Sequence, residues 1–145
     1  MTAQLSAEDI LLLIADGASG RFDLDPIRMM KGGFLAWAQG PDEWKNLFAF
    51  RAYDYGPFDS RLYSVRDELI QGGLLSVTRK GRYDSYALTD GGRARVAELR
   101  RQQPADTVDY LKRVGGYVTS RSFSDLLREI YEAFPAFATN SVFNK

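Results

Sequence analysis

Two residue types that carry much of protein chemistry are missing from this sequence. No cysteine occurs, which excludes disulfide bonds and thiolate zinc sites. No histidine occurs either, so the chain lacks the commonest general base and the commonest imidazole metal ligand. Nucleophilic sites of the Ser-His-Asp and Cys-His kinds are therefore excluded. No spacing of the remaining reactive side chains indicates an active site, and we expect neither an enzyme nor a bound cofactor or metal.

An excess of either charge and a long hydrophobic run are lacking as well. Nineteen Lys and Arg residues balance nineteen Asp and Glu residues, and this neutrality disfavours strong non-specific DNA binding while leaving room for a local basic surface. The apolar run at residues 10–15 is far shorter than the ~20 residues that cross a bilayer. The first residues carry no basic region of a signal peptide. We expect a cytoplasmic protein without a membrane partner.

What is present is typical of a single globular domain, since 45% of the 145 residues are hydrophobic and 26% are charged. Apolar periodicity and capping residues predict a series of helices. Gly32 and Gly33 lie inside the second of them, where they cost about 2 kcal/mol against alanine, so a kink or a close backbone approach is expected there. The predicted helices span residues 7–16, 26–38, 59–71, 90–103, 105–114 and 123–134, with Ser6, Asp25, Asp59 or Ser60, and Ser122 or Ser124 as N-caps.

The predicted strands add one extended segment and one hairpin. Residues 46–55 read as a strand that Gly56 and Pro57 end, and residues 74–78 and 82–89 read as two strands joined by a glycine turn. Two helices, a third helix after a tight turn and a hairpin follow the order of a winged helix-turn-helix. The predicted class is α+β, mostly helical. Residues 1–103 form the winged-helix domain, and residues 104–145 form a helical C-terminal extension that packs on it or makes a dimer seam.

A recurrent family pattern covers residues 48–92. It reads F-x-F…Y-x-Y-G-P-F…L-x-x-L…G-L-L…Y-x-L-T-x-x-G and resembles winged-helix proteins of bacteria and their phages. The part from "DELIQGGLL" through "YALTDGG" resembles the MarR and PadR regulators. The "YDYGPF" turn is more similar to small winged-helix proteins and to Panacea-domain antitoxins. The resemblance implies a wing that runs into a helix, and a role as a transcriptional regulator or an antitoxin.

A winged helix binds double-stranded DNA with its third helix and its wing. The third helix lies in the major groove, where Ser60, Arg61 and Ser64 are placed to meet base edges. The hairpin tip carries three cations suited to phosphate contact, Arg79, Lys80 and Arg82. Such regulators commonly bind as symmetric dimers, and we expect a homodimer paired through the C-terminal helices.

Each of these residues also has a purely structural interpretation. Arg61 is placed to pair with an acid of the same helix, such as Asp67 or Glu68, and the basic tip is compatible with a solvated hairpin. Asp59, Asp67 and Glu68 put negative charge where phosphate would be repelled. These acids favour a second hypothesis, in which the winged helix is a protein-interaction module such as an antitoxin, a phage-defence adaptor or an inhibitor.

The remaining candidate residues are expected to serve structure. We predict packing roles for the tyrosines, core positions for three residues of the second helix, and local capping or turn roles for an acidic group. For the C-terminal aromatics two alternatives stay open, packing on the first helix or a dimer seam. These four sets are Tyr53, Tyr55, Tyr63, Tyr83 and Tyr86; Met29, Met30 and Trp37; Asp23, Asp25 and Asp54; and Phe134, Phe137 and Phe143.

Overall fold

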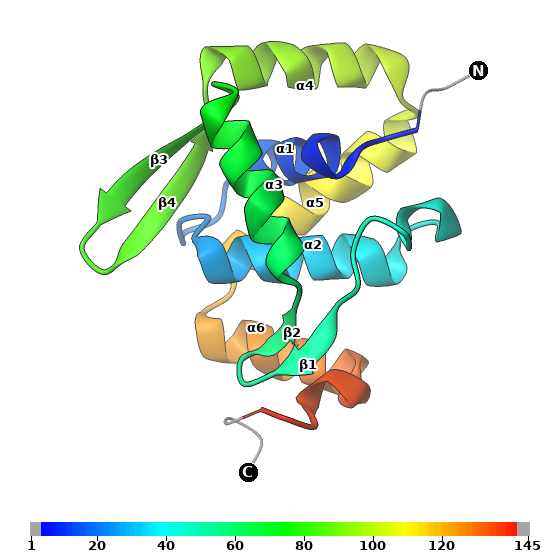
Figure 1. Ribbon diagram of the computed structural model, residues 1–145, viewed down its shortest axis with the longest axis vertical. Helices are drawn as coiled ribbons and strands as arrows, with labels where there is room; N and C mark the ends of the chain where they lie inside the picture. The colour runs from blue at the N-terminus through cyan, green and yellow to red at the C-terminus, as the bar shows by residue number, and fades with distance from the viewer. Residues whose placement is uncertain (1–3, 142–145) are drawn as a thin grey trace.

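Helices dominate the structure, and two short hairpins are attached to them (Figure 1). The computed structural model describes residues 4–141. Within this range the chain forms an α+β fold that is mainly helical, as the sequence predicts. The elements are α1 (Ala7–Asp16), α2 (Pro26–Gln39), the 3-10 turn η1 (Asp42–Trp44), β1 (Arg51–Tyr53), β2 (Gly56–Phe58), α3 (Ser60–Gln71), β3 (Leu75–Lys80), β4 (Tyr83–Leu88), α4 (Asp90–Gln102), α5 (Ala105–Ser120), α6 (Phe123–Ala133) and the 3-10 turn η2 (Pro135–Ala138).

The helix starts follow from capping chemistry. Ser6 and Asp9 form a reciprocal capping box at α1, and Asp25 caps α2 with a proline at its first position. Of the alternatives that the sequence leaves open, Asp59 caps α3 and Ser122 caps α6. Because a capping side chain accepts a hydrogen bond from a backbone N–H that the helix leaves unsatisfied, these residues fix where each helix begins.

The centre of the molecule is α1, whose residues from Asp9 to Ala15 are all buried. α3 crosses in front of the pair α1–α2 and α5 passes behind it (Figure 1). The glycines of α2 make this sandwich possible. A Cβ at Gly33 would lie 2.2 Å from Leu62 Cδ1 of α3, and a Cβ at Gly32 would lie 3.3 Å from Ile14 of α1. The close approach expected at these glycines is therefore present.

α5 is longer than the sequence predicts and belongs to the same core. It continues through Gly115 and Gly116, which favour a helix end in a sequence reading, to Ser120. The reason is packing: a Cβ at Gly115 would stand 1.9 Å from the carbonyl oxygen of Ile14, so only glycine lets α5 lie directly against α1. The buried face of α5 carries Val108, Leu111, Val114 and Val118.

The prediction of one strand over residues 46–55 is wrong. Only Arg51–Tyr53 are extended, and Gly56–Phe58 do not end a strand but form the second strand of a hairpin, with Ala52 opposite Pro57. Gly56 has φ +91°, which lets the chain reverse at once. The preceding residues are irregular, yet Phe48 and Phe50 are both buried, as their alternation predicts.

The C-terminal aromatics pack on α2 rather than on α1. The ring centres of Phe134 and Phe137 lie 5.0 and 4.7 Å from that of Phe34, and Phe50 approaches the same ring at 5.5 Å. α6 and η2 thus close the core beneath the β1–β2 hairpin (Figure 1). Phe143 lies outside the described residues.

The β3–β4 hairpin matches its prediction closely. Its strands pair from Leu75 opposite Leu88 to Lys80 opposite Tyr83, and Gly81, with φ +64°, makes the turn. Leu75 and Tyr86 anchor the hairpin in the core, while its tip extends away from the helices (Figure 1). Across residues 4–141, no helix has the length and apolar character needed to span a bilayer.

Candidate nucleic-acid interface

One side of α3 faces outward and is not covered by any other described part of the chain. Its inner side buries Leu62 and Leu69 against α1 and α2. On the outer side, Ser60, Arg61 and Ser64 are exposed, so their side chains are accessible. The C-terminal segment packs against β1 and β2 instead. α3 is therefore supported from beneath with its far side accessible.

Arg61 is paired with an acid, but not with either acid that the sequence suggests. Its Nη2 lies 2.9 Å from Asp59 Oδ2, in place of Asp67 or Glu68. Asp59 also accepts a hydrogen bond from the backbone N–H of Ala49, at 2.6 Å. Burial acts to raise the pKa of the Asp59 carboxyl, but the hydrogen bonds from Arg61 and Ala49 outweigh it and the pKa is lowered. Asp59 thus stays charged while it fixes the start of α3 and holds Arg61.

Arg66 joins α3 to the hairpin, a role that the sequence reading missed. Its guanidinium lies 4.4 Å from the ring centre of Tyr63 and donates to the hydroxyl of Tyr86 at 3.1 Å. It also pairs with Asp67 at 2.9 Å. The spacing of Tyr63 and Arg66, one helical turn apart, is the signal that could have indicated this contact. Tyr63 and Tyr86 have the packing roles predicted for them.

Two of the three tip cations are paired with acids. Arg79 Nη1 lies 3.2 Å from Asp84 across the hairpin, and Lys80 Nζ lies 3.1 Å from Asp23 in the α1–α2 loop. Tyr83 donates to the same Asp23 carboxylate at 2.8 Å, and the hydrogen bonds from Tyr83 and Lys80 lower the pKa of Asp23. Arg82 has no hydrogen bond or ion pair within residues 4–141 and is exposed.

Charges on this surface cancel. Glu8 of α1 lies beside Glu68, and its hydrogen bond raises the pKa of the Glu68 carboxyl, so the C-terminal part of α3 is locally acidic. Isolated exposed ion pairs are weak, so phosphate can compete for the paired cations. The interface combines the cations Arg61, Arg66, Arg79, Lys80 and Arg82 with the acids Asp23, Asp59, Asp67, Glu68 and Asp84.

The acidic residues named in the sequence have separate roles. Asp25 caps α2, Asp23 holds the β3–β4 tip, and Asp54 lies in the turn of the β1–β2 hairpin. Over residues 4–141, three or more acidic side chains nowhere gather as a metal site would require. Met29 and Met30 are buried in the core, as predicted.

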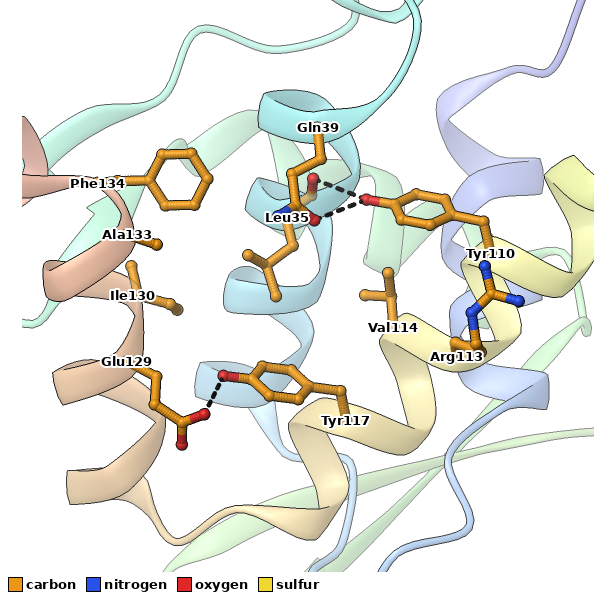
Figure 2. A pocket seen from close by; sticks show the side chains of 10 residues that line it. All are labelled: Leu35, Gln39, Tyr110, Arg113, Val114, Tyr117, Glu129, Ile130, Ala133 and Phe134. Carbon is orange, nitrogen blue, oxygen red and sulfur yellow. Dashed lines mark hydrogen bonds between the residues drawn. The ribbon is translucent and has the colours of Figure 1, made fainter.

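A separate cavity of about 270 Å³ lies between α2, α5 and α6 (Figure 2). Its phenol groups are bonded to the protein: the Tyr110 hydroxyl lies 3.1 Å from the Leu35 carbonyl oxygen and from Gln39 Oε1, and Tyr117 donates to Glu129 at 2.9 Å. Burial raises the pKa of both tyrosines to about 12. The cavity therefore presents mainly apolar walls and touches neither α3 nor the β3–β4 hairpin.

No protein-family model matches the chain, and no curated protein is significantly similar to it.

Proposed function

We propose that this protein is a winged-helix DNA-binding protein and acts as a small transcriptional regulator of the bacterial or phage type. In this proposal α1 and α2 support α3, α3 enters the major groove, and the β3–β4 hairpin is the wing. The observation that carries the proposal is the exposed outer side of α3, which the remaining described chain leaves accessible beside a hairpin bearing a free arginine. The pattern in residues 48–92 supports the same conclusion.

In this proposal α3 contacts bases and the β3–β4 hairpin contacts phosphate groups. Ser60, Arg61 and Ser64 stand on the first turns of α3, where side chains reach base edges, and an arginine is suited to a guanine. Arg61 must leave Asp59 to do so, which lowers the net gain of that contact. Arg82 leaves no acid behind when it meets a phosphate, so it is the strongest phosphate contact of the wing.

A mobility-shift titration at several salt concentrations tests the proposal, with duplex DNA from the region upstream of the gene as the probe. Arg82→Ala is expected to weaken binding and to reduce the salt slope by about one contact. Replacing Arg79 and Lys80 as well reduces it further. Lys112→Ala is the matched control, because Lys112 is an exposed cation on α5, on the other side of α1 from α3. Unchanged affinity and salt slope in the triple variant would remove the wing from the proposal.

A second candidate function follows from the cancelling charges of the interface. With acids beside four of its five cations, the outer side of α3 and the hairpin also suit a protein partner, as in an antitoxin or adaptor. The Arg61→Glu variant separates the two hypotheses when it is tested in both assays. Affinity capture from nuclease-treated native lysate, with one stoichiometric partner that the variant loses and no DNA shift by the native chain, would favour the protein-interaction module.

A further inference from the structure

A buried lysine without a counter-ion lies under the β1–β2 hairpin. Lys31 of α2 is only 3% exposed, and its Nζ donates a hydrogen bond to the carbonyl oxygen of Pro57 at 3.0 Å. No carboxylate within residues 4–141 pairs with it. Burial lowers the pKa of Lys31 to about 8. Buried charges in proteins are normally paired, so this ammonium group is an exception that calls for a partner.

Lys31 also lines a cavity of about 340 Å³ that opens to the surface. The walls are mainly aromatic, and two of them, Tyr53 and Tyr55, are 48% and 52% exposed. These are the most exposed large apolar side chains in the described part of the chain. Each packs against an aromatic ring, as the sequence predicts: the ring centre of Tyr53 lies 5.1 Å from that of Phe58, and the ring centre of Tyr55 lies 6.1 Å from that of Phe123. Tyrosines in such positions are enriched at protein interfaces.

The same cavity carries an acid that also has no partner. Asp54 lies in the hairpin turn between the two tyrosines, is exposed, and makes no hydrogen bond or ion pair with residues 4–141. No contact joins Asp54 to Lys31 within the chain. A single patch thus holds an exposed acid, a buried cation and three aromatic side chains, and neither charge is paired within residues 4–141.

We propose that this patch is the interface of a symmetric homodimer, in which Asp54 of each copy enters the cavity of the other copy and pairs with Lys31. A two-fold interface brings the same patch of both copies together, so the acid–cation contact forms twice. Tyr53 and Tyr55 then pack across the axis. A foreign acidic ligand would meet Asp54 in the lining of the cavity, whereas a second copy supplies Asp54 as the acid and gives both charges a partner.

This interface differs from the seam through the C-terminal helices that the sequence predicts. It lies at the end of the molecule formed by β1, β2 and α6, away from the tip of the β3–β4 hairpin (Figure 1). It does not rest on the proposed DNA binding, and its test uses no DNA.

Sedimentation velocity over a concentration series tests the proposal on the full chain. The native protein is expected to dimerise, and Asp54→Asn to raise the dimer dissociation constant by about 30-fold or more, because it leaves Lys31 buried and unpaired. Asp42→Asn is the matched control, since Asp42 is an exposed acid in η1. A native protein that stays monomeric at its highest soluble concentration would overturn the proposal, as would a dimer that Asp54→Asn leaves intact.

A mixing experiment guards against a Lys31 variant that simply fails to fold. Lys31→Met keeps Asp54, and Asp54→Asn keeps Lys31, so a heterodimer of the two retains one complete pair whereas each variant homodimer retains none. With different tags on the two chains, the heterodimer is expected to form more tightly than either homodimer. If the heterodimer forms no more tightly than the homodimers, Lys31 serves only to hold Pro57 and the proposal is wrong.

Discussion

The two hairpins of this protein share a plan and differ in surroundings. Each is antiparallel and has a glycine with positive φ at its reversal: Gly56, the residue that follows the turn, in one and Gly81, within the turn, in the other. The β1–β2 hairpin lies against α2, α6 and η2. The β3–β4 hairpin instead buries Leu75 and Tyr86, and its tip is held at the surface by the pair of Lys80 and Asp23. Because of this difference in surroundings, the cations at the two hairpins have different partners. Arg79 and Lys80 find acids at the surface, but Lys31 is buried with a single carbonyl group.

This contrast separates two ways in which a hairpin serves a protein. At the exposed hairpin, charges are hydrated and their ion pairs are weak, so partners can be exchanged at low cost. At the inner hairpin, each polar group that is left unpaired costs more because water is excluded. We therefore expect changes at the inner hairpin to affect stability and association, and changes at the outer hairpin to affect binding.

The largest effect is expected from the aromatic cluster beneath β1–β2. Phe34 is fully buried and meets three other phenylalanine rings, so Phe34→Ala should lower the free energy of unfolding by about 3–5 kcal/mol. Val77→Ala, at an exposed position of β3, should stay within about 0.5 kcal/mol. Urea denaturation of both variants checks the comparison, and equal losses would contradict it.

A smaller effect, dependent on pH, is expected from Lys31. Its pKa falls from 10.5 to about 8 on folding, so below pH 8 both states carry the proton and the unfavourable effect of burial is complete. Between pH 8 and 10.5 the unfolded state binds more protons, and the free energy of unfolding should rise with pH, by up to about 3 kcal/mol.

The measurement is urea denaturation at both ends of this range, made with Asp54→Asn so that no dimer contributes. The same chain with Lys31→Met is the reference, because it retains every other titrating group. A rise of equal size in both chains would show that Lys31 is not its source.

The two turn glycines provide the next comparison. Gly56→Ala places a methyl group 3.0 Å from Leu127 at φ +91° and should cost about 2 kcal/mol, from strain and crowding together. Gly81→Ala meets nothing within 4 Å and should cost only about 1 kcal/mol, from its φ of +64°. Thermal denaturation of the pair ranks them, and the opposite order would contradict the description of the inner hairpin as closely packed.

The smallest effect is expected from the ion pair of Arg79 and Asp84. A double-mutant cycle with Arg79→Ala and Asp84→Ala should give a coupling energy below about 1 kcal/mol, since both side chains are exposed. A larger coupling would mean that Arg79 is not readily available to a phosphate group, and it would weaken the case for the proposed wing.

The sequence predicts the β3–β4 hairpin and most helices because their signals are local. Asp25, Asp59 and the turn glycine Gly81 each act on residues a few positions away. The end of α5 and the β1–β2 hairpin are missed because their causes are distant in sequence. Gly115 continues a helix only because α1 lies against it, and a hairpin of three-residue strands has no periodicity to detect.

In the candidate interface, too, local features could be predicted from the sequence and contacts between distant residues could not. Exposure of Ser60, Arg61 and Ser64 follows from helical periodicity, and the structure agrees with it. The partners of the cations do not follow, because Asp23 reaches Lys80 from a loop far away in the sequence. Lys31 carries no local signal at all, since its burial depends on β2 folding over α2.

The aromatic contact between Phe34 and the pair Phe134 and Phe137 also has a consequence for synthesis of the protein. α2 leaves the ribosome well before the rings that complete its surroundings, because Phe134 and Phe137 lie far downstream of Phe34 in the sequence. Until they emerge, Phe34 and its neighbours stay exposed to water, and a nascent chain with such exposed apolar side chains is prone to aggregate. Emergence of Phe134 and Phe137 from the ribosome, rather than completion of the hairpins, is thus the moment at which this half of the molecule can close.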